Sequence, residues 1–208
     1  MRYLPEFTSE EIMDNHILFR SRNDLYKEKG LDFMGNRKFI FEKIGSLDGD
    51  ILEIGSGKGV TAVFLTKKGY RIVSIDKNDK MLKIAALNLA YEKLLAKTDL
   101  HVMDAYFLDF EREHFNNIFI IEALHHIDNI DGLFAEVDKV LAKNGRLILA
   151  DFNEKGMGIV NKVHESEGNV HENSFVGSED AKKWLSGHDY NVKSYDDNCH
   201  WVLISEKR

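Results

Sequence analysis

The sequence of 208 residues predicts an α/β fold, with a Rossmann-like, mostly parallel seven-stranded sheet, helices on both faces and a last strand that runs antiparallel. Apolar segments bounded by polar turns alternate with helical patterns over residues 50–151, which is typical of a parallel sheet covered on both faces. A glycine-rich loop follows the first of these apolar segments. The last two strand-like segments are separated by a turn that is short enough for an antiparallel hairpin.

The start of the chain, residues 1–45, is expected to form a helical cap on this core. Thr8 followed by Glu11 is a capping-box pattern, and it predicts a helix that ends near Gly30. A second helix is expected over residues 32–44.

The remaining elements follow in chain order, and no proline or linker marks a boundary, so residues 1–208 are predicted to form a single domain. After residue 151 the pattern lapses into short glycine-bounded pieces over residues 152–177, and a helix and the hairpin complete residues 178–208. Expected strands are 50–56, 70–78, 99–105, 116–124, 145–152, 190–197 and 200–207, and expected helices are 59–69, 79–97, 129–145 and 178–187.

Composition argues against several classes of partner and location. The net charge of −7 and the lack of a basic stripe argue against nucleic-acid binding, which depends on lysine and arginine at phosphates. The acidic N-terminus is a poor signal peptide, and no stretch approaches the roughly 18 apolar residues of a membrane helix. The single cysteine, Cys199, cannot form an internal disulfide. We expect a cytoplasmic protein without a membrane span, and the patterns indicate no oligomeric state.

The glycine-rich loop, ILEIGSGKG at residues 51–59, could belong to three kinds of nucleotide site. A P-loop needs serine or threonine after its lysine, whereas Lys58 precedes Gly59. The dinucleotide fingerprint G-x-G-x-x-G needs a third glycine at the position of Val60, which disfavours a nicotinamide-dependent oxidoreductase. What remains is E-x-G-x-G-x-G, in which Glu53 ends a strand and the glycines let a ligand approach the backbone.

With this loop, the sequence resembles the class I S-adenosylmethionine-dependent methyltransferases, and is similar to the small-molecule branch of ubiquinone and menaquinone biosynthesis. The resemblance covers roughly residues 35–151 and the final hairpin. Five segments carry it in order: LEIGSGKG, VSIDKND, HVMDA, FNNIFIIEALHHI and LAKNGRLILADF. Asn116 stands where the family's fourth motif carries aspartate, and no Asn/Asp-Pro-Pro-Tyr motif follows, which makes methylation of base or glutamine amines a poorer expectation.

The resemblance implies S-adenosylmethionine as cofactor and a small-molecule methyl acceptor. It assigns residues 50–151 to cofactor binding and residues 152–177 to the acceptor pocket, with Asp76 at the ribose hydroxyls. The alternatives are a helix-capping role for Asp76, a structural role for Glu53 and, for the whole chain, a non-catalytic S-adenosylmethionine-binding regulatory protein. The implied cofactor-binding residues are Glu53, Gly55, Ser56, Gly57, Gly59, Asp76, Lys77, Met81, Asp104, Ala105 and Glu122.

Paired histidines, His125 and His126, follow the fourth expected strand, where ligands bind in doubly wound sheets. Either could act as a general base, and His126 is the favoured catalytic residue, although the pair could also be structural packing near the cofactor. No metal site is expected, because the spacing of the other histidines and the cysteine matches no zinc pattern. His164 and His171 are expected to line the acceptor pocket or to face solvent, and Cys199 and His200 to point to opposite faces of a strand.

Overall fold

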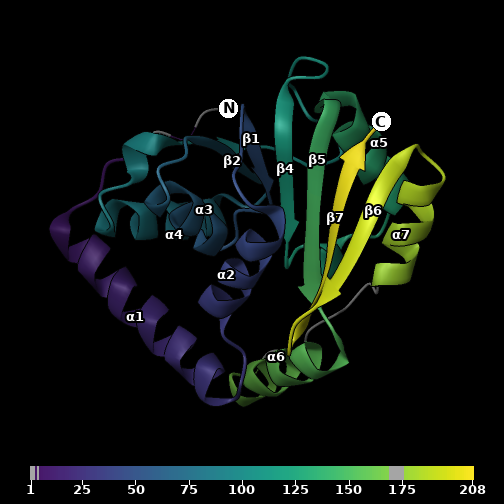
Figure 1. Ribbon diagram of the computed structural model, residues 1–208. Coiled ribbons are helices and arrows are strands. Elements are labelled where there is room, and N and C mark those ends of the chain that lie inside the picture. Colours follow the sequence, from purple (N-terminus) through teal and green to yellow (C-terminus); the bar gives the residue numbers. More distant parts are fainter. Residues whose placement is uncertain (1–2, 4, 169–175) are drawn as a thin grey trace.

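The computed structural model describes residues 3, 5–168 and 176–208, and it contains a seven-stranded sheet in the order β3-β2-β1-β4-β5-β7-β6 (Figure 1). The strands are β1 Ile51–Ile54, β2 Ile72–Asp76, β3 Thr98–Val102, β4 Phe115–Ile121, β5 Leu141–Phe152, β6 Tyr190–Asp196 and β7 His200–Lys207. The helices are α1 Ser9–Glu28, α2 Phe33–Ile44, α3 Val60–Lys67, α4 Asp79–Tyr91, α5 Ile130–Val140, α6 Glu154–Ser166 and α7 Ser178–Ser186, with 3-10 turns at Leu95–Lys97 and Leu124–His126. Among the described helices, none is long and apolar enough to cross a membrane.

The pairing of the strands confirms the predicted fold class. Strands β1 to β5 pair in parallel, β7 runs antiparallel to β5, and β6 forms the predicted hairpin with β7. From β1 the chain places β2 and β3 toward one edge of the sheet, and then returns to place β4 and β5 on the other side of β1. The carboxyl ends of β1 and β4 therefore flank a crevice of the kind in which open α/β sheets bind ligands.

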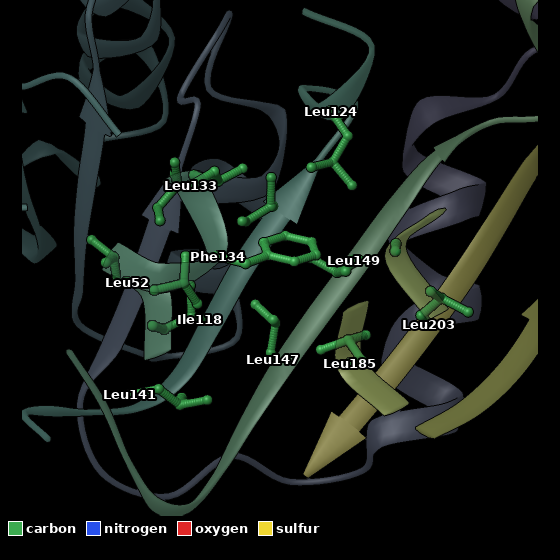
Figure 2. Packing of buried hydrophobic residues seen from close by; sticks show 14 of the residues in the cluster. Leu52, Ile118, Leu124, Leu133, Phe134, Leu141, Leu147, Leu149, Leu185 and Leu203 are labelled. Atoms are coloured by element: carbon green, nitrogen blue, oxygen red, sulfur yellow. The ribbon is translucent and has the colours of Figure 1, made fainter. Parts of the chain in front are cut away.

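Apolar side chains fill both faces of the sheet. On one face, Phe134 of α5 packs against Leu147 and Leu149 of β5, and α7 adds Leu185 (Figure 2). On the other face, α2, α3 and α4 cover residues such as Phe119. Strands buried on both faces must be apolar at nearly every position, which explains why their segments lack the alternation of a half-buried strand.

Helix α6 lies beyond the carboxyl end of β5, and the C-terminal end of α1 lies beside α6 (Figure 1). Helix α1 begins with the predicted capping box between Thr8 and Glu11. Tyr26 is the one buried residue of α1, and it packs with Met157 and Val160 of α6 and with Phe152 in a third apolar cluster. Helices α1 and α6 therefore cover the crevice, whereas α2 covers a face of the sheet.

Three sequence-based expectations were wrong, and one of them is the helix over 79–97, which ends at Tyr91. Residues 152–177 were expected to hold only short glycine-bounded pieces, but α6 is a 13-residue helix whose buried face includes Met157, Val160 and Val163. Asn153 caps it by accepting a hydrogen bond from the Gly156 amide (3.0 Å). The expected helix over 129–145 ends at Val140, because Leu141 already pairs with Phe115 in the sheet.

The two glycines of α6 give a test of how this helix packs. A Cβ at Gly156 would overlap the carbonyl oxygen of Cys199, whereas a Cβ at Gly158 would meet nothing within 4 Å. Gly156→Ala should therefore destabilise the protein by about 1–3 kcal/mol through overpacking. Gly158→Ala, the matched control, should stabilise it by about 0.5–1 kcal/mol. Urea unfolding measures both changes, and equal effects of the two variants would contradict this position of α6.

Candidate functional site

A cleft with two lobes lies at the carboxyl ends of β1, β2 and β4. The first lobe has a volume of about 460 Å³ and the second of about 200 Å³. Gly55, Gly57, Met81 and Glu122 line both, so the two lobes adjoin each other. Of the predicted site residues, the first lobe also contains Asp76, Lys77, Asp104, Ala105 and His126, and the second contains Glu53, Ser56, His125 and His164.

The glycine loop forms the floor between the lobes. The amides of Gly55 and Ser56 both donate to the carbonyl oxygen of Ile75 at 2.9 Å, which holds the loop against β2. Gly55 has φ +83°, and a Cβ there would lie 2.8 Å from the Cβ of Ala123. Gly59 lines neither lobe; its lack of a side chain lets α3 approach Ala85 of α4, which gives this glycine a packing role.

Asp76 ends β2 and joins the loop to the next turn. Its carboxylate accepts hydrogen bonds from the Gly57 amide and from the Asn78 amide, both at 2.9 Å. The helix-capping alternative for Asp76 was wrong, because the side chain of Asn78 accepts the bonds from the first turn of α4. Asp76 is thus held in place by backbone amides while its carboxylate borders the first lobe.

Glu53 ends β1 in the second lobe and is almost completely buried. The hydroxyl of Ser74 donates to its carboxylate, and the hydroxyls of Ser56 and Ser74 are 2.6 Å apart. Burial raises the pKa of Glu53 to about 7, although the hydrogen bond from Ser74 and the positive charge of Arg37 oppose the rise. This carboxyl group therefore changes its charge near neutral pH, and a cation in the lobe would favour its ionised form.

Glu122, just after β4, is the centre of a buried network of charges. The Arg37 guanidinium of α2 donates to it, and the His200 imidazole of β7 donates to it at 3.0 Å. Burial alone would raise the pKa of Glu122, but Arg37 and His200 outweigh burial and lower it to about 2. The other nitrogen of His200 lies 3.2 Å from Asp197. Burial lowers the pKa of His200, and the two carboxylates overcome that effect and raise it above 6.5.

The paired histidines lie in different lobes. His125 is buried in the second lobe, where its Nδ1 lies 2.8 Å from Asp151 and its backbone amide donates to the same carboxylate. His126, the favoured catalytic candidate, lines the first lobe beside Ala105. If Nδ1–H donates to Asp151, the proton of the neutral ring is on Nδ1 and Nε2 carries the lone pair that a base needs.

The remaining histidine and cysteine predictions can be compared with the structure in part. His164 was expected either to line a pocket or to face solvent, and in the structure it is on α6 and lines the second lobe. His171 lies outside the described residues. Cys199 donates to the carbonyl oxygen of Gly30 (3.3 Å), whereas His200 contacts Glu122, so the two side chains have different partners. Within the part of the chain that the structure describes, no group of three His, Cys, Asp or Glu side chains could hold a metal ion.

Arg37 and Lys58 line the second lobe but are absent from the predicted site residues. Arg37 lies on the buried face of α2 with Ile40 and Ile44. An arginine on the apolar face of a helix is a signal that could have identified it, because a buried charge needs a partner. Lys58 is in the glycine loop itself, where its side chain was considered only for a P-loop.

The charges on His200 and Glu122 predict a pH-dependent contribution to stability. The folded pKa of His200 is raised, so its contribution is complete below about pH 6.5 and is lost as the pH rises through the folded pKa. His200→Gln should cost about 1.5–3 kcal/mol at pH 5.5, and this cost should fall as the pH rises through the folded pKa of His200. Urea unfolding over a series of pH values from 5.5 upward measures this, with the exposed His114→Gln as control. A cost that grows as the pH rises would contradict a charged His200.

Comparison with known proteins agrees with this geometry. A family model described as a methyltransferase domain matches residues 52–149. The chain is 31% identical over 133 residues to the ubiquinone/menaquinone biosynthesis C-methyltransferase UbiE of Teredinibacter turnerae. That alignment covers 62% of this chain and 53% of the relative. This chain is also 22% identical over 193 residues to the uncharacterized methyltransferase YcgJ of Bacillus subtilis. That alignment covers 92% of this chain and 76% of the relative. The chain spans about half the length of several of the curated relatives that it matches.

A solved structure extends the likeness over almost the whole chain. A candidate S-adenosyl-L-methionine-dependent methyltransferase from Methanococcus maripaludis superposes with a TM-score of 0.69, at 15% identity, over 99% of this chain and 98% of that chain. At this identity the likeness shows the fold alone. The matched segment, residues 52–149, holds the glycine loop, Asp76, Asp104 and Glu122. Residues 52–149 therefore match a methyltransferase domain, and the comparisons together support a class I S-adenosylmethionine-dependent methyltransferase.

Proposed function

We propose that this protein transfers a methyl group from S-adenosylmethionine to a small-molecule acceptor. The observation that carries the proposal is the distribution of charge in the two-lobed cleft. Asp76 borders the first lobe, while Glu53, Glu122 and Arg37 border the second. S-adenosylmethionine has neutral ribose hydroxyls at one end and a sulfonium, an ammonium and a carboxylate at the other, and this distribution is complementary to it.

The first lobe suits the adenosine part of the cofactor. Its volume of about 460 Å³ is within the usual range for small-molecule sites. We assign the ribose hydroxyls to Asp76, because a fixed carboxylate at the end of the second strand can accept bonds from both of them. Asp104, Ala105 and Met81 would then contact the adenine.

The inner end of the second lobe suits the methionine part. Glu53 and Glu122 supply negative charge for the ammonium and the sulfonium. Arg37 uses Nη1 for Asn36 and Glu122 and Nε for Thr61. Within the described residues no hydrogen bond is found for its Nη2, which makes this nitrogen the best candidate partner for the cofactor carboxylate.

The second lobe also suits the chemistry of transfer. The cofactor, when bound, supplies an electrophilic methyl group on its sulfonium. His125 can remove a proton from the acceptor through Nε2, and Asp151 holds its ring and stabilises the imidazolium that results. Tyr26, Phe152 and Val160 can exclude water from the reacting atoms. The name of the Teredinibacter relative, a C-methyltransferase of quinone biosynthesis, supports a small-molecule acceptor.

The ribose assignment predicts the effect of removing one charge. Asp76→Asn keeps the shape of the side chain but removes a charged acceptor, so affinity for S-adenosylhomocysteine should fall by about 1.5–3 kcal/mol. Asp79→Asn, three residues further along on the exposed first turn of α4, is the matched control and should leave the affinity unchanged. Calorimetry measures both. Unchanged affinity in a folded Asp76→Asn protein would remove the ribose assignment.

We expect substitution of His125 to affect turnover and substitution of His126 to affect cofactor affinity, because His125 rather than His126 is proposed as the base. His125→Gln should lower turnover by about 10²–10⁴-fold, as loss of a general base does, while affinity for S-adenosylhomocysteine changes by less than about 0.5 kcal/mol. His126→Gln should weaken cofactor binding more than turnover, because it lines the first lobe. Release of S-adenosylhomocysteine in a metabolite extract measures turnover. Full activity of His125→Gln would exclude it as the base.

A further inference from the structure

Lys58 is a cation inside the second lobe. It belongs to the glycine loop, and its side chain lines the lobe together with Asn23 and Tyr26 of α1 and His164 of α6. Removal from water lowers the pKa of Lys58 to about 8, and the nearby positive charge of Arg22 lowers it further, against the opposing effect of Glu167. Its ammonium is therefore still mostly charged at pH 7, at the cost of part of its hydration.

The carboxylates around this lobe have other partners. Glu167 lies 2.7 Å from Arg22, Glu122 accepts from Arg37, and Asp151 lies 2.8 Å from His125. Glu53 is bonded to Ser74 at the inner end of the lobe. Over residues 3, 5–168 and 176–208, Lys58 has neither an ion pair nor a side-chain hydrogen bond. Within the described residues, the Lys58 ammonium is thus left without an ion-pair partner of its own, and Glu167 attracts it without contacting it.

A second buried donor lies near Lys58. Within the described residues, the buried Nε of Arg22 has no hydrogen-bond partner, although the other end of its guanidinium binds Glu167. Buried donors without a partner are uncommon in folded proteins, and they often mark places where a ligand or water binds. Arg22 is close enough to Lys58 to lower its pKa, although Arg22 itself does not line the second lobe.

The apolar walls of the second lobe limit which kind of anionic ligand could bind to Lys58. Tyr26 and Phe33 form an edge-to-face pair with ring centroids 5.1 Å apart, and Phe152 lies beside Phe33 at 6.4 Å. These rings and Val160 line the same lobe as Lys58. The lobe has a volume of about 200 Å³ and its inner end is assigned to the methionine part of the cofactor, so only a small acceptor fits beside the cofactor.

We propose that Lys58 binds an anionic group of the methyl acceptor, so that the substrate class of this enzyme is small organic acids with an apolar or aromatic body. This inference rests on the proposed function. The cofactor also carries a carboxylate, but Arg37 lies beside the Glu53 and Glu122 carboxylates that suit the cofactor's ammonium. Lys58 lies instead next to α1 and α6, which provide the apolar wall of the lobe.

Benzoate and its neutral counterpart benzamide test the proposal, because the two have nearly the same shape. Each is titrated by NMR into the wild-type protein with and without saturating S-adenosylhomocysteine. In the complex, benzoate should bind at least tenfold more tightly than benzamide. Lys58→Gln should remove that preference by weakening benzoate alone, and should change S-adenosylhomocysteine affinity by less than twofold. Lys143→Gln, an exposed lysine at the amino end of β5, is the control and should keep the preference.

The other outcomes overturn the proposal or separate it from the proposed function. Equal binding of benzoate and benzamide to the wild-type protein, or binding of neither, would overturn it. A Lys58→Gln protein that loses S-adenosylhomocysteine affinity but keeps the preference for benzoate would assign this lysine to the cofactor carboxylate and would also overturn it. If S-adenosylhomocysteine does not bind but a preference for benzoate that depends on Lys58 persists, the anion site stands and the proposed function fails.

Discussion

The buried carboxylate of Glu122 is the constraint on which the site depends. A charge in this position is tolerated only with close partners, and it has two, Arg37 of α2 and His200 of β7. Its backbone has φ +56°, a conformation that L side chains rarely adopt, so the surrounding packing must hold it there. The network therefore fastens α2 and the C-terminal hairpin to the end of β4. Of its members, Glu122 borders both lobes of the cleft and Arg37 borders the second.

This arrangement links stability to binding. Arg37 contributes to stability through Nη1 and Nε, while its position in the lobe leaves Nη2 on the ligand side. Glu53 shows the opposite balance, since burial raises its pKa to about 7 even though the hydrogen bond from Ser74 and the positive charge of Arg37 favour its ionised form. A cationic ligand would restore that charge at low cost. The inner end of the second lobe thus combines one carboxylate that the fold satisfies and one that a ligand would satisfy.

The parts predicted from sequence are those in which neighbouring residues carry the information. Strands buried on both faces appear as continuous apolar runs, and the capping box of α1 spans only four residues, from Thr8 to Glu11. Helix α6 was missed because Gly156 and Gly158 look like breaks in a helix, although Gly156 is required by the carbonyl of Cys199. Arg37 was missed because its partner is 85 residues away in sequence, and His200 is 78 residues from Glu122. Contacts at that separation depend on the strand order, which no local pattern reports.

The division between predicted and missed residues follows the two lobes. The first lobe is built by turns at strand ends, where the backbone geometry itself needs particular residues such as Gly55 and Asp76. The outer part of the second lobe is built by α1 and α6, whose inward side chains can change without disturbing the sheet. Lys58 belongs to both parts, because its backbone is in the glycine loop while its side chain extends toward these helices. A residue in that position can change the charge of the second lobe while the loop keeps its geometry, and on the proposed function its substitution changes substrate choice without changing the fold.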